Sequence, residues 1–158
     1  MTDNSNWRGE EGPPPRQGTL SREERWDLLA AADARELIAL ADACLAAEPA
    51  PELAILAPPR TGCVTAEVRD PILRERFLLG DVLACSAEIE LDGVRGWAMR
   101  TGDDRAAVLA MAICDAAGET PGAAAVEELC RRVAARLADR EAAEWAELAP
   151  TVVEFEEL

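Results

Sequence analysis

The sequence contains no histidine, and all 16 of its basic residues are arginine. Without histidine the chain lacks Ser-His-Asp and Cys-His nucleophile pairs, histidine-ligated metal centres and the usual general base near neutral pH. Its 31 acidic residues give a net charge of −15, and such a chain repels the phosphates of nucleic acids. The composition therefore disfavours both nucleic-acid binding and an enzyme that acts alone.

Long apolar runs and paired cysteines are also missing. No window is long enough to span a membrane, and the first residues lack the basic and apolar regions of a signal peptide, so we expect a cytoplasmic protein with no membrane partner. The five cysteines are widely spaced and none forms a CxxC pair, which predicts reduced, mostly buried thiols and no metal or other cofactor in this chain. They are Cys44, Cys63, Cys85, Cys114 and Cys130.

The 158 residues are sufficient for one domain with a single core. Residues 1–19 are rich in proline and glycine and poor in apolar residues, which predicts a disordered leader. The folded domain is then expected over residues 20–158. Abundant alanine and only 4% aromatic residues indicate closely packed helices.

Helix signals stand at both ends of this domain. Ser21 with Glu24, and Asp33 with Glu36, are typical of capping boxes, and they predict two short helices that end near residues 48–49. Later, Asp103 is expected to cap one helix that ends at Gly118. The pair 120–121 is expected to open a longer helix with an apolar stripe that includes Val126, Leu129, Cys130, Val133 and Leu137.

The pattern in the middle third of the chain predicts an antiparallel meander. Residues 53–56 form a short apolar run that the proline pair 58–59 is expected to break, and residues 61–69, 82–91 and 94–101 are expected to be strands. Asp92-Gly93 is a strong hairpin signal. Residues 151–155 alternate like a terminal strand. We therefore predict a single α+β domain, with an antiparallel sheet flanked by N-terminal and C-terminal helices.

Arginines are frequent in the predicted sheet, and guanidinium groups suit carboxylate or phosphate oxygens. Most of these arginines are expected to pair with surface acids. The segment Arg60-Thr61-Gly62 is expected in a loop before the long strand, where its amides and guanidinium would offer a weak anion or substrate site. The alternative is a plain tight turn. We find no catalytic residues in the sequence.

An ordered set of short motifs resembles the PhnG family, the small subunit of the bacterial carbon–phosphorus lyase core complex, over about residues 22–155. The motifs are Arg25-Trp26-Asp27-Leu28-Leu29-Ala30, Pro59-Arg60-Thr61-Gly62-Cys63-Val64, Arg69-Asp70-Pro71, Phe77-Leu78-Leu79-Gly80-Asp81-Val82-Leu83, Leu91-Asp92-Gly93, Gly96-Trp97-Ala98-Met99 and Gly102-Asp103-Asp104-Arg105-Ala106. Each motif alone has low specificity, whereas their order is fairly specific.

The resemblance implies a role in organic phosphonate catabolism. It implies an accessory subunit of a transferase, ribose 1-methylphosphonate 5-triphosphate synthase, that moves an alkylphosphonate to C1 of the ribose of a nucleoside triphosphate and releases the purine base. The implied partners are a large nucleosidase-like subunit, a radical S-adenosylmethionine subunit and a third accessory subunit, with the nucleosidase chemistry on the large one. The alternatives are a stand-alone acidic adaptor, an anion-binding module without a catalytic role, or an enzyme that uses a cysteine nucleophile.

Overall fold

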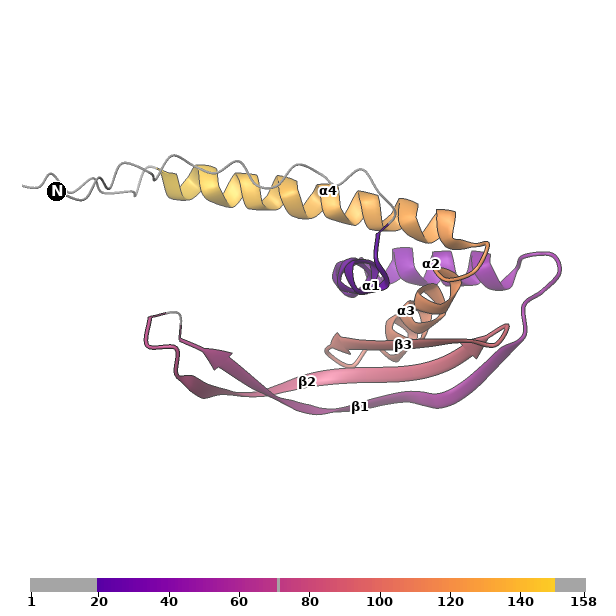
Figure 1. Cartoon of the computed structure of the whole chain (residues 1–158), viewed down its shortest axis with the longest axis horizontal. Coiled ribbons are helices and arrows are strands. Elements are labelled where there is room, and N and C mark those ends of the chain that lie inside the picture. Colours follow the sequence, from indigo (N-terminus) through magenta and orange to yellow (C-terminus); the bar gives the residue numbers. More distant parts are fainter. Residues whose placement is uncertain (1–19, 71, 150–158) are drawn as a thin grey trace, which may run out of the picture.

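The computed structural model describes residues 20–70 and 72–149. In this part of the chain, four helices cover one face of a three-stranded antiparallel sheet of order β1-β2-β3, which confirms the predicted α+β class (Figure 1). The predicted leader at 1–19 and the predicted terminal strand at 151–155 lie outside the described residues. Helix α3 lies on the sheet, and α4 forms the outermost layer.

Helices α1 (Arg22–Ala31) and α2 (Ala34–Leu45) begin where the sequence predicts. Ser21 and Glu24 form a complete capping box, each side chain accepting from the other's backbone amide. Asp33 caps α2 by accepting from the amide of Arg35. The Glu36 carboxylate does not complete a second box, because it accepts two hydrogen bonds from Arg136 of α4 instead.

Two of the three strands are longer than predicted, and the third has the predicted bounds. β1 spans Leu53–Arg69, β2 spans Arg76–Leu91 and β3 spans Val94–Thr101. The expected break at the proline pair 58–59 is wrong: β1 continues through it, with irregular register on both sides of Ala57. An edge strand tolerates proline because the missing N–H removes no ladder bond. The predicted hairpin is confirmed, with positive φ at both Asp92 and Gly93.

Helix α3 (Arg105–Ala117) is buried almost all round, with ten of its 13 residues buried. The sheet covers one side and α1, α2 and α4 contact the others. Its N-cap is Asp104, whose carboxylate accepts from the amide of Ala107, and not Asp103 as predicted. The alanine side chains are small, so the backbones of neighbouring elements can approach α3 closely.

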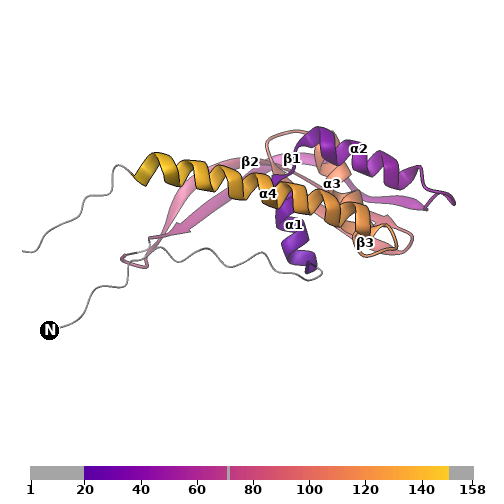
Figure 2. The same cartoon turned by 90° about the horizontal axis from the view of Figure 1, so that it is seen from above.

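Helix α4 (Ala123–Leu148) begins two residues later than expected, with Gly122 as N-cap. Thr120 stands in the preceding turn, where its hydroxyl donates to the carbonyl of Ala117 and accepts from the amide of Gly122. The predicted stripe is buried from Val126 to Val133, and α1 lies beneath this half of α4 (Figure 2). Beyond Leu137, the described part of α4 is exposed.

An ion pair between a buried carboxylate and a partly exposed guanidinium joins α1, α3 and β3. The carboxylate of Asp115, 2% exposed, accepts from Nε and Nη2 of Arg22 at 3.1 and 2.7 Å and from the amide of Trp97 at 3.1 Å. Nearby, Arg25 pairs with Glu119 beneath α4. A bidentate guanidinium satisfies the carboxylate oxygens, which makes the burial of this charge tolerable.

Gly96 marks the closest approach of the sheet to α3. A Cβ at this position would meet the carbonyl oxygen of Ala112 and lie 3.0 Å from the Cβ of Ala116. Gly62, also within a strand, has nothing within 4 Å of its virtual Cβ. A methyl group is therefore expected to lower the free energy of unfolding at Gly96 but not at Gly62.

We predict that Gly96→Ala lowers the free energy of unfolding by about 1–3 kcal/mol or more, because β3 must move away from α3. Gly62→Ala is the matched control and is expected to leave stability unchanged or slightly raised, because strand glycines carry an entropic cost. Urea unfolding of the two variants checks this, and equal stability would contradict the close packing of β3 on α3.

Candidate functional site

Arg60, Thr61 and Gly62 lie inside β1 and not in a loop. They pair with Ser86, Cys85 and Ala84 of β2, respectively. The expectation of a loop, and with it the alternative of a tight turn, is wrong because β1 continues past its prolines. The φ angle of Gly62 is not positive, unlike those of Gly80, Gly93 and Gly102.

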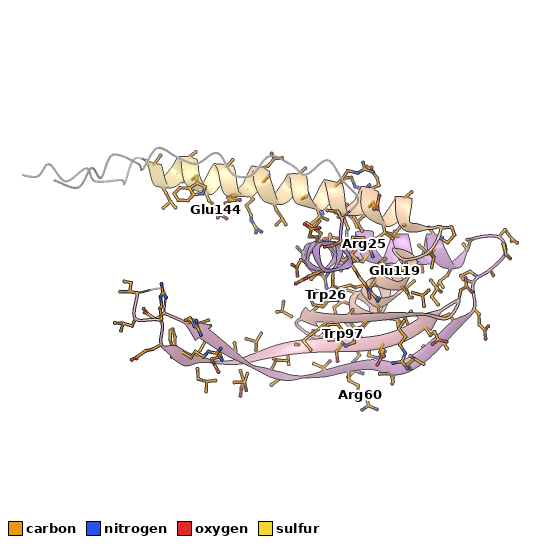
Figure 3. All side chains as sticks on the ribbon, viewed as in Figure 1. Arg25, Trp26, Arg60, Trp97, Glu119 and Glu144 are labelled. Atoms are coloured by element: carbon orange, nitrogen blue, oxygen red, sulfur yellow. The ribbon has the colours of Figure 1, made fainter. Side chains whose placement is uncertain are left out.

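Alternation along β1 separates the three residues. Arg60 points away from the helices (Figure 3), whereas Thr61 pairs with Cys85, a buried residue on the opposite, helix-covered face. The Thr61 hydroxyl oxygen is buried and has no hydrogen-bond partner among the described residues. The structure therefore brings Arg60 and Gly62 together on the open face and leaves Thr61 on the other.

The open face of the sheet carries a shallow hollow of about 220 Å³ beside Arg60. It arises because Gly62 has no side chain and Ala84 opposite it has a small one, while Ser86 and Met99 border it. Arg60 is the one cation among the residues that line it. This arrangement offers one guanidinium to an anion.

The expected pairing of sheet arginines with surface acids is found for two of them among the described residues. Arg76 pairs with Glu67 at 3.3 Å and Arg95 with Glu88 at 3.5 Å. Arg100 instead donates to the carbonyls at the end of α1, Leu29 and Ala32, at 3.0 and 2.9 Å. Burial lowers the pKa of Arg100, whose role is to hold the α1–α2 connection on the sheet.

The thiols do not form a reactive centre. Cys85, Cys114 and Cys130 are buried, Cys44 is half-buried and Cys63 is exposed, so the prediction of burial is confirmed for three of the five. Burial raises the pKa of Cys130 to about 11 and that of Cys114 further, which suppresses their thiolates. No group of three or more potential metal ligands occurs within residues 20–70 and 72–149.

An exposed apolar surface lies where β1 and β2 extend beyond the end of β3. We call this segment, residues 63–70 and 72–83, the arm. At its tip, the Asp70 carboxylate accepts from the amides of Ile72 and Leu73. The arm projects from the core with no described helix packed on it (Figures 1 and 3). It therefore consists of two strands without a core of their own.

Apolar side chains cover both faces of the arm. Ile72 is 87% exposed and Leu78 and Leu79 are each 65% exposed. Because consecutive strand residues point to opposite faces, the run from Phe77 to Leu79 exposes apolar groups on both. The other large exposed apolar residues of the arm are Val64, Leu73, Val82 and Leu83.

Sequence reasoning did not identify this surface. The signal was present: three consecutive large apolar residues at 77–79 violate the alternation of a half-buried strand. The far half of α4 has the same character on a smaller scale, with Trp145 and Leu148 exposed. None of the described helices is both long and apolar enough to cross a bilayer.

The described residues therefore form an α+β domain with an exposed apolar arm, and large exposed apolar surfaces are typical of interaction sites. A family model described as phosphonate metabolism protein PhnG matches residues 20–158. The chain belongs to the PhnG family, whose members are subunits of the carbon–phosphorus lyase complex, and it has a role in phosphonate metabolism. Among curated proteins, none matches the chain significantly.

We predict that iodoacetamide at mildly alkaline pH modifies Cys63 first in the native chain and modifies Cys85, Cys114 and Cys130 only after unfolding. Exposure favours the first thiol, and burial with raised pKa protects Cys114 and Cys130. Peptide mass mapping over time checks this, with a urea-unfolded sample as the control in which all five react. Early modification of Cys114 would contradict the buried assignment.

Proposed function

We propose that the chain is an accessory subunit of the carbon–phosphorus lyase core complex. In this role it supports the transfer of an alkylphosphonate to C1 of the ribose of a nucleoside triphosphate, with release of the purine base. Membership of the PhnG family supports the pathway. The apolar arm is the observation that favours a subunit over a protein that acts alone.

The physical argument starts from the instability of an uncovered arm. A two-stranded ribbon is marginally stable in water by itself, and large exposed apolar patches mark interaction sites. The arm exposes apolar side chains on both faces, so one flat partner surface cannot cover it. The arm is therefore expected to insert between two partner surfaces, or into a groove of one partner.

Its partners in this proposal are a large nucleosidase-like subunit, a radical S-adenosylmethionine subunit and a third accessory subunit. The nucleoside triphosphate and the phosphonate are substrates of the whole complex, and catalytic residues and cofactors are supplied by other subunits. The composition supports this division of labour, because the chain lacks histidine for nucleophile pairs. We place this complex in the cytoplasm, where reduced cysteines persist.

A second candidate role is that of an anion-binding module, or of an adaptor with the same site. The observation in its favour is the Arg60 guanidinium, which is exposed beside the hollow and has no ion-pair partner among the described residues. An anionic group of a substrate or partner would suit it. Thr61 also lines the hollow, but its buried hydroxyl lies on the other face of the sheet and is not expected to take part directly.

Reconstitution tests the main proposal. The chain alone is expected to release no base from a nucleoside triphosphate in the presence of methylphosphonate, whereas the four co-expressed subunits do. Omission of this chain should abolish the activity or the assembly. Base release by the chain alone would contradict an accessory role, and full activity of the other three subunits without it would contradict the proposal as a whole.

We predict that Leu78→Arg in the arm weakens assembly by at least about tenfold, because a buried unpaired charge at an interface costs more than 1.4 kcal/mol. The isolated variant should keep its melting temperature within a few degrees, since Leu78 is exposed in the free chain. Ala39→Arg, an exposed position of α2, is the matched control. Co-purification and thermal melts measure both quantities, and normal assembly of Leu78→Arg would show that the arm is not the interface.

The anion-binding role makes a separate prediction for the assembled complex. If Arg60 holds an anionic group of a substrate, Arg60→Ala raises the KM for that substrate by about tenfold or more, because a charge-assisted hydrogen bond contributes about 1.5–3 kcal/mol. Arg105→Ala, which removes another exposed arginine, should leave KM unchanged. Equal KM values for wild type and both variants would favour an adaptor that does not contact the substrate.

A further inference from the structure

A hollow of about 490 Å³ lies between α1 and β3, beside the Arg22–Asp115 ion pair. Its walls include Trp26 and Trp97, whose rings stack with centroids 5.3 Å apart and planes 8° apart. The Trp26 indole N–H donates to the Trp97 carbonyl at 2.9 Å, which fixes the pair. Trp97 is 43% exposed, so its ring remains accessible from the solvent.

Of the charged side chains in the wall of this hollow, Arg22 has an ion-pair partner and Glu23 does not, among the described residues. Arg22 donates to both oxygens of Asp115 and to the carbonyl of Arg95, so its charge is neutralised by a buried partner. Glu23, also in the wall, is exposed and has no ion-pair partner among the described residues. Asp27 stands four residues further along α1 and is also exposed, on the same side of the helix as Glu23.

These observations favour a cation as the occupant. An indole face attracts a cation through its quadrupole, and the attraction grows when the pair is removed from water. Glu23 supplies the opposite charge at the rim, and the exposed arginines Arg22 and Arg95 already pair with Asp115 and Glu88, respectively. An anion would find neither a free guanidinium nor a favourable field there, because Arg22 is occupied and the chain carries −15.

We propose that this hollow binds a cationic side chain, lysine or arginine, from a partner protein, with the cation on the exposed ring of Trp97 and with Glu23 as its counter-charge. The partner is a subunit of the complex proposed above, so the inference rests on that proposal. The site is distinct from the arm: the arm buries apolar area, whereas this contact selects a charge and a position. Such contacts set the orientation of a complex more than its total affinity.

The decisive test is stepwise fluorination of Trp97, introduced at that position alone. Fluorine withdraws charge from the ring face and keeps its shape nearly constant, so a packing role predicts no trend, whereas a cation on the ring predicts a graded loss. We expect the affinity of this chain for its partner subunits to fall by up to about tenfold across the series. Unchanged melting temperatures of the free chain would show that the stack with Trp26 is intact.

Charge removal at the rim gives the second measurement. Glu23→Gln should weaken assembly several-fold at low salt and less at high salt, because added salt screens the pair. Asp42→Asn, an exposed carboxylate of α2 outside the hollow, is the matched control and should have little effect. A photo-reactive residue in place of Trp97 should cross-link to a partner segment that contains lysine or arginine.

The outcomes separate the two proposals. If the wild-type chain does not assemble with the other subunits, the proposed function fails and this inference fails with it. If it assembles, but affinity is flat across the fluorinated series, or the cross-link reaches a segment without a basic residue, only this inference is overturned. A fluorination-sensitive dimer of the isolated chain would place the cation on a second copy and would likewise overturn the partner assignment.

Discussion

The buried carboxylate of Asp115 organises the helical layer on the sheet. It lies on α3, binds the Arg22 guanidinium of α1 and accepts from the Trp97 amide of β3, so three elements meet at one charge. Removal of Arg22 would leave the Asp115 carboxylate as a buried charge without compensation, whereas Arg22, 46% exposed, could be solvated by water if Asp115 were removed. The same bonds neutralise Arg22 and leave Glu23 as the unpaired charge in the neighbouring wall.

Close packing of α3 is the second constraint, and it follows from small residues. Gly96 and the alanines of α3 let the backbones of β3 and α3 approach, and the helix becomes buried on nearly all sides. The core is consequently compact and concentrated around α3. It leaves no apolar cover for the far parts of β1, β2 and α4, which extend beyond it.

The sequence predicts the core better than the periphery. Caps at Ser21 and Asp33, the hairpin at residues 92–93 and the buried stripe of α4 depend on local patterns, and each was found in place. The break predicted at the proline pair 58–59 is wrong, because whether proline breaks a strand depends on its position at an edge, which no local pattern reveals. That error moved Arg60 into a loop and hid the alternation that separates it from Thr61. The Trp26–Trp97 stack joins residues 71 apart, a distance that periodicity cannot bridge.

The arm also affects how readily the chain aggregates after its synthesis and before its assembly. An unpaired, apolar β-ribbon is a template for aggregation, yet this one carries charges of both signs around its tip, including Asp70, Arg74, Glu75 and Arg76. Such gatekeeping charges disfavour edge-to-edge growth, and the −15 of the whole chain makes two copies repel each other. Long-range repulsion thus disfavours self-association of the unassembled subunit, while the apolar arm remains accessible to a partner of a different charge.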